Sequence, residues 1–388
     1  MTNEPRTERP RARRARRRTR AIAVLLAAVA AALVVVALVR VDLVSRYRDW
    51  RLGYRVRWTP AGVVPSYSRS GQLAVGSRVA VDLVGGDPSP RAAIWHAASG
   101  EVEPIDLGEI AGVDAGTRSR AGSMHDAGFV IGTLYRDENH LARGWLWSRE
   151  RGAIDLGSLG GSQIAPIAVN GRGEVVGWAA TPNGRHAFVW TRDGGLIDLG
   201  VAGYASAISE LGLVVGTIED RGAATFEPFL WTREAGVRRL GFVDGFTLGE
   251  AADVNSRGEI LVNFLAPKDI GGGRTRFVAT SYVFCERTER SERRERSEGN
   301  GYRPLPRPPA GIEVRGAAID AAGTVLLASH DASAPGPAYL VRAGRLVDLP
   351  EMPGSERTHW EALAPRGVLL GRALVDGEWR GFVAEPVR

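Results

Sequence analysis

The apolar positions of this chain fall into short runs separated by turn residues, and the pattern recurs along almost the whole length. The clearest copy extends from Ser162 to Gly200 and contains four such runs. Short apolar runs bounded by Gly, Pro, Asn and Asp predict β-strands, and a recurring unit of about forty residues is typical of repeat architectures. The pattern therefore predicts an all-β chain built from one recurring unit.

Each copy predicts a hairpin between its first two strands. A glycine precedes the second run, and in most copies Asn, Asp or Ser lies three positions before that glycine. This spacing favours a type I turn, because the short polar side chain bonds the backbone of its own turn. The glycines are Gly71, Gly128, Gly173, Gly212, Gly258, Gly323 and Gly367, preceded at this spacing by Ser68, His125, Asn170, Ser209, Asn255, Asp320 and Ala364.

Two further strands are expected in each copy. The third runs start at Ala92, Gly144, Ala187, Pro228, Ser281, Ala338 and Gly381, and the first four of them end in Trp95, Trp147, Trp190 and Trp231. A fourth run reads IDLG at Ile105, Ile154 and Ile197, and it degenerates to RRLG at Arg238, RPLP near Arg303 and VDLP at Val347. The seventh copy ends before a fourth run appears.

Seven units of four strands predict a seven-bladed β-propeller, in which radial repetition leaves only short, protected sheet edges. The strand-like stretch from Gly53 to Thr59 lies before the first unit, and we expect it to supply the missing strand of the last blade. The repeat domain then covers residues 53–388. A ring of six or eight blades and an open solenoid are the alternatives.

The third copy contains the motif AxNxxGxVVG followed by HAFVW and IDLG, and the run LGSLGGSQ precedes it. These motifs resemble the HAF-repeat family of bacterial extracellular proteins. The resemblance extends from Gly62 to Arg388 but weakens in copies five to seven, where the His is absent. It implies a surface or secreted location and no defined chemistry, so it assigns no catalytic residue. The residues that carry it best are Ala168, Asn170, Gly173, Val175, Val176, Gly177, His186, Ala187 and Phe188.

The N-terminal segment predicts a membrane anchor. Residues 1–20 contain nine Arg and two Glu, and nineteen uncharged apolar residues follow from Ala21 to Val39. That length spans a bilayer as a helix, and the basic flank favours a cytoplasmic N-terminus with the body outside. Residues 40–52 form a juxtamembrane linker. A cleaved signal followed by secretion is the alternative, although the apolar core is long for a signal peptide.

Charge lies unevenly along the chain. The net charge is +6, but residues 1–20 contribute +7, so the remaining chain sums to −1 and gives no support for a nucleic-acid partner. The mixed-charge run 286–300 and the prolines after it predict a disordered insert over residues 286–310. The single cysteine, Cys285, excludes an intramolecular disulfide, and we expect it to act as a small buried hydrophobe.

Recurring polar residues are expected to be structural. Asp106, Asp155, Asp198 and Asp348 recur in the fourth runs, whereas a catalytic group is needed only once. Single-copy polar residues in loops are the better candidates for binding, because loops on a rigid scaffold carry function. These candidates are Glu138, His140, His186, Glu219, Asp220, Glu356, His359 and Trp360.

Two functional classes are compatible with these observations. The first is a membrane-anchored, extracytoplasmic, non-catalytic binding or scaffold module, monomeric, with a surface protein or a glycan as its partner. The second is a propeller hydrolase or lyase of envelope glycans, which requires two carboxylates at one opening. No catalytic motif, metal-ligand spacing or cofactor motif was found in the sequence. We therefore expect no metal and no cofactor, and we favour the first class.

Overall fold

The computed structural model describes residues 54–59, 63–65, 78–83, 91–96, 99, 101–108, 110, 117–135, 143–269, 271–272, 274–285, 301–309, 312–329, 336–352, 354–364 and 367–386. The chain divides into two compact units, and the second, Arg55–Pro386, contains almost all of these residues. Their regular elements are β-strands. Within these ranges, no helix has the length and apolar character needed to cross a bilayer. The predicted tail, anchor and linker over residues 1–52 lie outside the described residues.

Four sheets each contain four antiparallel strands. The first sheet is β1 (Tyr54–Trp58), β27 (Glu378–Pro386), β26 (Val368–Val375) and β25 (Arg357–Ala364). The second is β2 (Val63–Pro65), β3 (Arg78–Leu83), β4 (Arg91–His96) and β5 (Glu101–Pro104). The third is β6 (Arg118–Met124), β7 (Val130–Tyr135), β8 (Arg143–Ser148) and β9 (Gly152–Asp155). The fourth is β21 (Arg315–Ile319), β22 (Val325–Ala328), β23 (Ala338–Arg342) and β24 (Arg345–Leu349).

The remaining strands form one eleven-stranded sheet that repeats the same hairpin order. The long strand β13 pairs with β12 through its first half and with β14 through its second half, so it joins two four-stranded groups. A single parallel bridge between Phe226 and Leu248 joins the next group. The strands are β10 (Ile164–Val169), β11 (Val175–Thr181), β12 (Gly184–Thr191), β13 (Gly195–Ile208), β14 (Val214–Asp220), β15 (Thr225–Thr232), β16 (Gly236–Arg239), β17 (Leu248–Val254), β18 (Ile260–Asp269), β19 (Thr275–Phe284) and β20 (Tyr302–Pro304).

The predicted turns between first and second strands are confirmed where the structure describes them. Gly173 has a φ of 75° and donates its N–H to the Asn170 carbonyl at 3.0 Å. The Asn170 Oδ1 accepts the N–H groups of Arg172 and Glu174, both at 3.1 Å. A positive φ is readily adopted only by glycine, which explains its place in the repeat. The φ angles at Gly128, Gly212, Gly258, Gly323 and Gly367 are likewise positive.

A second glycine recurs within the second strand because the first strand approaches it closely. A Cβ on Gly177 would lie 2.0 Å from the carbonyl oxygen of Ala165. The register between β10 and β11 shifts between Pro166 and Ala168, which leaves Ile167 as the extra residue of a bulge. The first strands β6, β13, β17, β21 and β25 have the same kind of shift. Backbone contact at a bulge therefore accounts for this glycine.

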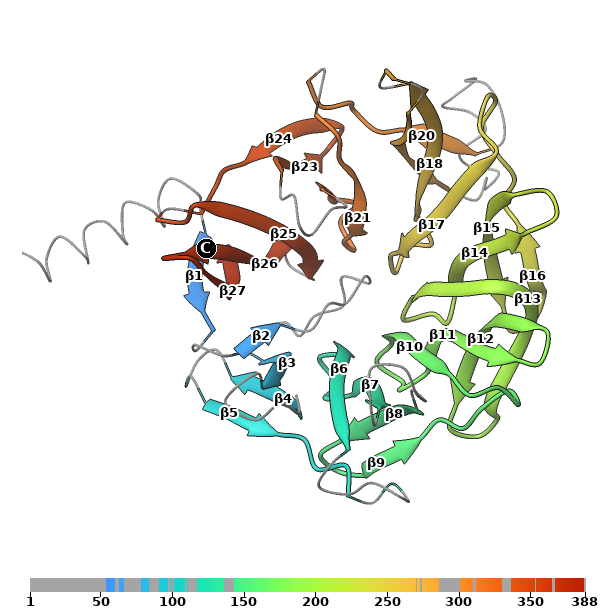
Figure 1. The fold of residues 1–388 in the computed structure, drawn as a ribbon, viewed down its shortest axis with the longest axis vertical. Helices are drawn as coiled ribbons and strands as arrows, with labels where there is room; N and C mark the ends of the chain where they lie inside the picture. Colours follow the sequence, from blue (N-terminus) through green and yellow to red (C-terminus); the bar gives the residue numbers. More distant parts are fainter. Residues whose placement is uncertain are drawn as a thin grey trace, which may run out of the picture. The chain divides into compact units, whose positions relative to one another are not determined.

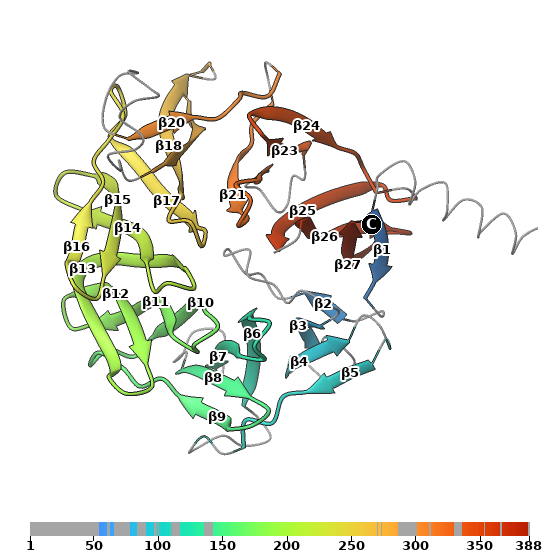
Figure 2. The ribbon, with the colours of Figure 1, turned by 180° about the vertical axis from the view of Figure 1, so that it is seen from behind.

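Apolar clusters join neighbouring strand groups. One cluster packs Ile131 and Leu146 against Phe188, and another packs Ala93 and Trp95 of β4 against strands β25–β27. Figures 1 and 2 show the groups following one another around a common centre, with β1 beside β27. The strand expected from Gly53 to Thr59 is thus present as β1, and it pairs with the last strand of the chain.

Two expectations about the fifth copy need correction. The predicted disordered insert 286–310 includes β20, whose Tyr302 contacts Phe264 at 5.1 Å between ring centroids, and the buried Leu305 follows it. Residues 302–304 therefore belong to the sheet, because Tyr302 packs against other aromatic rings. Residues 286–300 lie outside the described residues. Cys285 follows β19 and is partly rather than fully buried.

Candidate functional site

The sheets have two ends that differ in character. At the turn end, first strands connect to second strands and third strands connect to fourth strands. At the loop end, second strands connect to third strands. The described loop-end connections differ in length, from Pro182–Asn183 to the longer segments 221–224 and 270–274. The two ends therefore offer separate surfaces for a functional site.

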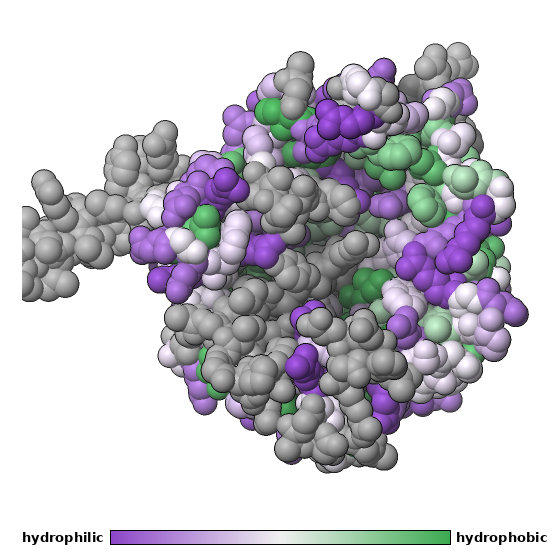
Figure 3. Space-filling model, viewed as in Figure 1, coloured by the Kyte–Doolittle hydropathy of each residue, from purple (hydrophilic) through white to green (hydrophobic). Residues whose placement is uncertain are grey.

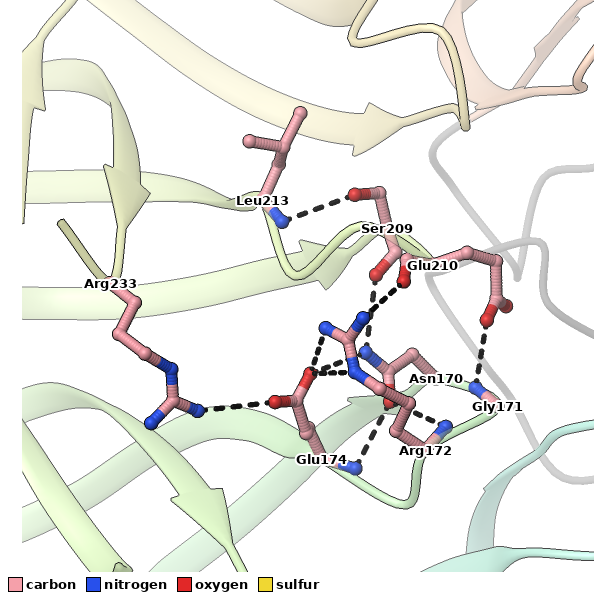
Figure 4. Close-up of polar contacts among 8 residues, drawn as sticks. All are labelled: Asn170, Gly171, Arg172, Glu174, Ser209, Glu210, Leu213 and Arg233. Atoms are coloured by element: carbon pink, nitrogen blue, oxygen red, sulfur yellow. Dashed lines mark hydrogen bonds and ion pairs between the residues drawn. The ribbon is translucent and has the colours of Figure 1, made fainter.

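The turn end is held by hydrogen bonds between neighbouring copies (Figure 4). The Asn170 amide donates to Glu174 at 2.7 Å and to the Ser209 carbonyl of the next copy at 3.2 Å. Arg172 donates to the same Glu174 carboxylate and to the carbonyl of Glu210. Burial acts to raise the pKa of Glu174, but the hydrogen bonds from Arg172 and Asn170 and the nearby arginine charges outweigh it, and the pKa is lowered.

The same arrangement occurs a second time. The Asn255 amide donates to Glu259 at 2.6 Å and to the Asp320 carbonyl of the following copy at 3.0 Å. Arg257 pairs with Glu259, as Arg172 pairs with Glu174. A contact repeated in this way connects adjacent copies, so these polar residues are structural.

A cavity of about 280 Å³ opens at the loop end between the third, fourth and fifth copies. Three aromatic side chains and three charged side chains surround it together with the bulge residue of β10. Its lining residues come from seven strands and are Ile167, Trp178, Arg185, Tyr204, Glu219, Phe226 and Glu250. Aromatic walls with a few convergent polar groups are typical of ligand sites.

Arg185 organises one side of this cavity. Its guanidinium lies 5.6 Å from the ring centroid of Trp178 and 5.6 Å from that of Tyr204. It also forms an ion pair with Glu219, whose side chain is 10% exposed. Strand β12 supplies the arginine and β14 of the next copy supplies the carboxylate. The aromatic faces and the Glu219 carboxylate both attract the guanidinium and so hold it at this position.

The other side of the cavity is more open. Phe226 at the start of β15 is 38% exposed. Glu250 of β17 accepts one hydrogen bond at its Oε2, from Arg315 at 3.2 Å, and 24% of its side chain is exposed. Within the described part of the chain, its Oε1 has no hydrogen-bond donor. The cavity wall thus includes an exposed ring and a carboxylate oxygen that has no donor among the described residues.

The sequence candidates have different positions in the structure. Glu219 lines the cavity, and the adjacent Asp220 accepts the N–H groups of Gly222 and Ala223 and thereby holds the β14–β15 turn. Glu138 and His140 lie outside the described residues. The structure thus brings one predicted residue, Glu219, to the cavity.

The remaining candidates make local contacts. His186 at the start of β12 pairs through its Nδ1 with Asp198 at 2.9 Å. Glu356 accepts the N–H of Gly377 at 3.0 Å and so supports the β26–β27 turn. The expectation that His359 and Trp360 lie in a loop is wrong, because both belong to strand β25.

The burial of this pair follows from packing. Trp360 is 3% exposed and lies edge-on to Phe382 at 5.0 Å, while His359 is 7% exposed. The His359 Nδ1 lies 3.2 Å from Glu361, and its Nε2 lies 3.3 Å from the Ser329 carbonyl. Apolar area favours an interior position for such an aromatic residue over a place in a loop.

The recurring aspartates make structural contacts in three copies, although these lie within their own turns and not between copies. Asp106, Asp155 and Asp198 each accept the N–H of the glycine two residues later, at 2.8 to 2.9 Å. Such Asx turns fix the backbone that leaves the fourth strand.

Nothing in the sequence indicated the buried Asp253, which accepts the N–H groups of Val254 and Ile319 at 2.8 and 2.9 Å. Burial raises its pKa to about 7, against the lowering effect of these two donors.

Most cavity residues were absent from the sequence candidates. Trp178, Arg185, Tyr204, Phe226 and Glu250 each occur in one copy and leave no local motif. Their positions also vary in chemistry among the copies, since Tyr204 corresponds to Ala165 in one copy and to Glu250 in another, so the repeat itself did not mark them. Among the described residues, no group of three or more His, Cys, Asp or Glu is placed to hold a metal ion.

No protein-family model matches the chain, and no curated protein matches it either. Solved structures do resemble it. The β-propeller domain of the Trilobed protease from Pyrococcus furiosus, which has an open velcro topology, aligns with a TM-score of 0.55 and 10% identity over 84% of this chain and 96% of that chain. An oligogalacturonate lyase in complex with manganese aligns with a TM-score of 0.51 and 10% identity over 86% and 94% of the two chains.

A puromycin hydrolase mutant aligns with a TM-score of 0.51 and 16% identity, over 85% of this chain and 53% of the hydrolase. At these sequence identities the similarity is one of fold and does not assign an activity to this chain, since one fold hosts many functions. The repeated antiparallel four-stranded groups agree with these alignments. The chain therefore has an all-β fold of the β-propeller type.

Proposed function

We propose that this chain is a non-catalytic binding module that recognises its partner through the loop-end cavity. The observation that carries the proposal is the convergence of Trp178, Tyr204 and Phe226 with Arg185, Glu219 and Glu250 around one opening. These side chains differ from copy to copy, so the repeat does not require them at these positions, although the Arg185–Glu219 ion pair also joins two copies. Loops and strand ends on a rigid framework are where binding residues concentrate.

The polar groups of the cavity are arranged for recognition. Glu219 is paired with Arg185, and Glu250 is paired with Arg315. A carboxylate that pairs with an arginine is held in place, which suits a fixed hydrogen-bond acceptor.

We further propose a seven-bladed ring closed by β1, with the N-terminal segment as a membrane anchor that holds the body outside the cytoplasm. The pairing of β1 with β27 and the packing of β4 against the last sheet support the closure. The basic tail, the nineteen-residue apolar stretch and the resemblance to HAF repeats support the location.

A glycan hydrolase or lyase is the second candidate function, because Glu219 and Glu250 line the same cavity.

The deciding experiment uses the full chain in detergent with insoluble envelope polysaccharide and with envelope protein. Binding is measured by co-sedimentation and turnover by the release of new sugar ends. We expect binding without turnover, reduced in Glu250→Gln and unchanged in Asp193→Asn, an exposed turn-end residue. Sugar release that disappears in Glu219→Gln would reject the binding module and establish the enzyme.

A further inference from the structure

We infer that the loop-end cavity accepts a cationic side chain, a guanidinium or an ammonium group, from a peptide or protein partner. The inference rests on the proposed binding function and names the chemistry of its ligand. A cavity of about 280 Å³ is large enough for the end of one long side chain, and its wall contains aromatic rings and carboxylates. This combination is the one that recognises cations in proteins.

The cavity already holds one cation of the protein itself. The guanidinium of Arg185 lies 5.6 Å from the centroids of both Trp178 and Tyr204, and it pairs with Glu219. The aromatic rings therefore present their negative faces to a positive group in this structure. A second cation can use the same kind of contact on the open side of the cavity.

The open side supplies a ring and an acceptor that are only partly used. Phe226 is 38% exposed, and the Glu250 side chain is 24% exposed. Glu250 accepts a hydrogen bond at Oε2 from Arg315 at 3.2 Å. A carboxylate can accept several hydrogen bonds, so Oε1 can take a donor from a ligand while the contact with Arg315 is kept.

The charged groups at the cavity do not by themselves select a ligand, because Glu219 is paired with Arg185 and Glu250 with Arg315. The preference for a cation rests on the exposed aromatic face and on the partly exposed Glu250 carboxylate, whose second oxygen can accept a donor. A neutral saccharide can also stack on aromatic rings, and the experiment below separates it from a cation.

The test compares two peptides that differ in one charge. The full chain in detergent is titrated with acetyl-Gly-Arg-Gly-amide and with the citrulline peptide, whose side chain has nearly the same shape without the charge. Binding is followed by ligand-observed NMR. We expect the arginine peptide to bind at least about tenfold more tightly than the citrulline peptide, which corresponds to about 1.4 kcal/mol.

Variants locate the site. Glu250→Gln and Phe226→Ala are each expected to weaken binding of the arginine peptide about tenfold, whereas Asp193→Asn at the turn end leaves it unchanged. Thermal unfolding of each variant verifies that the fold is kept. Because the arginine and citrulline peptides are compared on the unmodified chain, a variant that fails to fold does not affect the main result.

The outcomes are separable. Equal binding of both peptides, no binding of either, or a loss in Asp193→Asn that matches Glu250→Gln overturns the cation inference. Binding of a neutral oligosaccharide in place of the peptides, lost in Phe226→Ala, also overturns it but leaves the binding module intact. Sugar release in the same samples rejects the proposed function itself.

Discussion

The turn end and the loop end of the sheets are built from the same repeat but carry different kinds of residue. At the turn end the same side chains recur: Asn170 and Asn255 bond a glutamate of their own turn and a carbonyl of the next copy. At the loop end, the residues that line the cavity change in type from copy to copy: Arg185 and Phe226 occupy equivalent positions in neighbouring copies.

The difference separates the scaffold from the site. A turn must satisfy its own backbone and meet its neighbour in every copy, so its residues recur. A ligand is bound once, so its contacts occur once. Figure 3 shows hydrophilic and hydrophobic residues interspersed over the described part of one face, so overall polarity does not indicate a site there. The single-copy residues around the loop-end cavity indicate one.

The largest expected effect is on the seam between the first and last strands. Removing residues 1–60 deletes β1, in which Trp58 lies 5.6 Å from Phe382 and which is followed by Thr59, bonded to Gly381. We expect the free energy of unfolding to fall by at least about 5 kcal/mol relative to removal of residues 1–48, because an aromatic contact is lost and a sheet edge is exposed. Denaturant unfolding of both truncated chains measures this. Equal midpoints would show that β1 does not hold the last sheet.

The buried Asp253 gives the next largest effect. Its folded pKa of about 7 lies above the usual value of 3.8, so between these values the folded state binds more protons than the unfolded state. Its contribution to stability is therefore complete below about pH 4 and is lost as the pH rises to about 7, by at most about 4 kcal/mol.

In Asp253→Asn this loss is absent. We expect the stability of the variant relative to the unmodified chain to increase from pH 4 to pH 7 and to stay constant above that, as measured by urea unfolding at several pH values. Parallel curves for the two proteins would contradict the buried, protonated carboxyl. Asp269→Asn, an exposed residue, serves as the control.

The third largest loss of stability is expected for a substitution at Gly177. A Cβ at Gly177 would meet the Ala165 carbonyl oxygen at 2.0 Å, and backbone cannot move as easily as a side chain. We expect Gly177→Ala to cost about 3 kcal/mol of unfolding free energy. Gly184→Ala at the loop end has open space around its Cβ, so it carries only the strain of a positive φ. Similar losses in both variants would show that close approach is not the cause.

The smallest effect compares the two ends directly. Asn170 is fully buried and bonds two copies, so Asn170→Ala should cost about 2 kcal/mol, since buried partners are left unsatisfied. Asp220 is exposed and bonds only its own turn, so Asp220→Ala should cost less than about 1 kcal/mol. Thermal unfolding in parallel measures both. A reversed order would contradict the larger contribution to stability assigned to the turn end.

The sequence predicted a large part of the fold. The third runs correspond to strands β4, β8, β12, β15, β19, β23 and β27, and the turn glycines have the expected backbone conformation where they are described. These features follow from local chemistry, because turn residues and apolar alternation act within a few neighbouring residues. The loop position expected for His359 and Trp360 was wrong because their contacts are not local: Trp360 packs against Phe382, and His359 lies 3.3 Å from the Ser329 carbonyl.

By itself, the sequence determined the repeat, its strands and turns, and the separation of a basic, apolar N-terminal segment from a nearly neutral body. Only the tertiary structure decided which single-copy side chains meet. Trp178 and Glu250 reach the same cavity from strands β11 and β17, and the buried Asp253 accepts the N–H of Ile319 in strand β21. Such sites depend on how neighbouring sheets pack against each other. This packing brings together residues that are far apart in the sequence, and no local pattern predicts their contact.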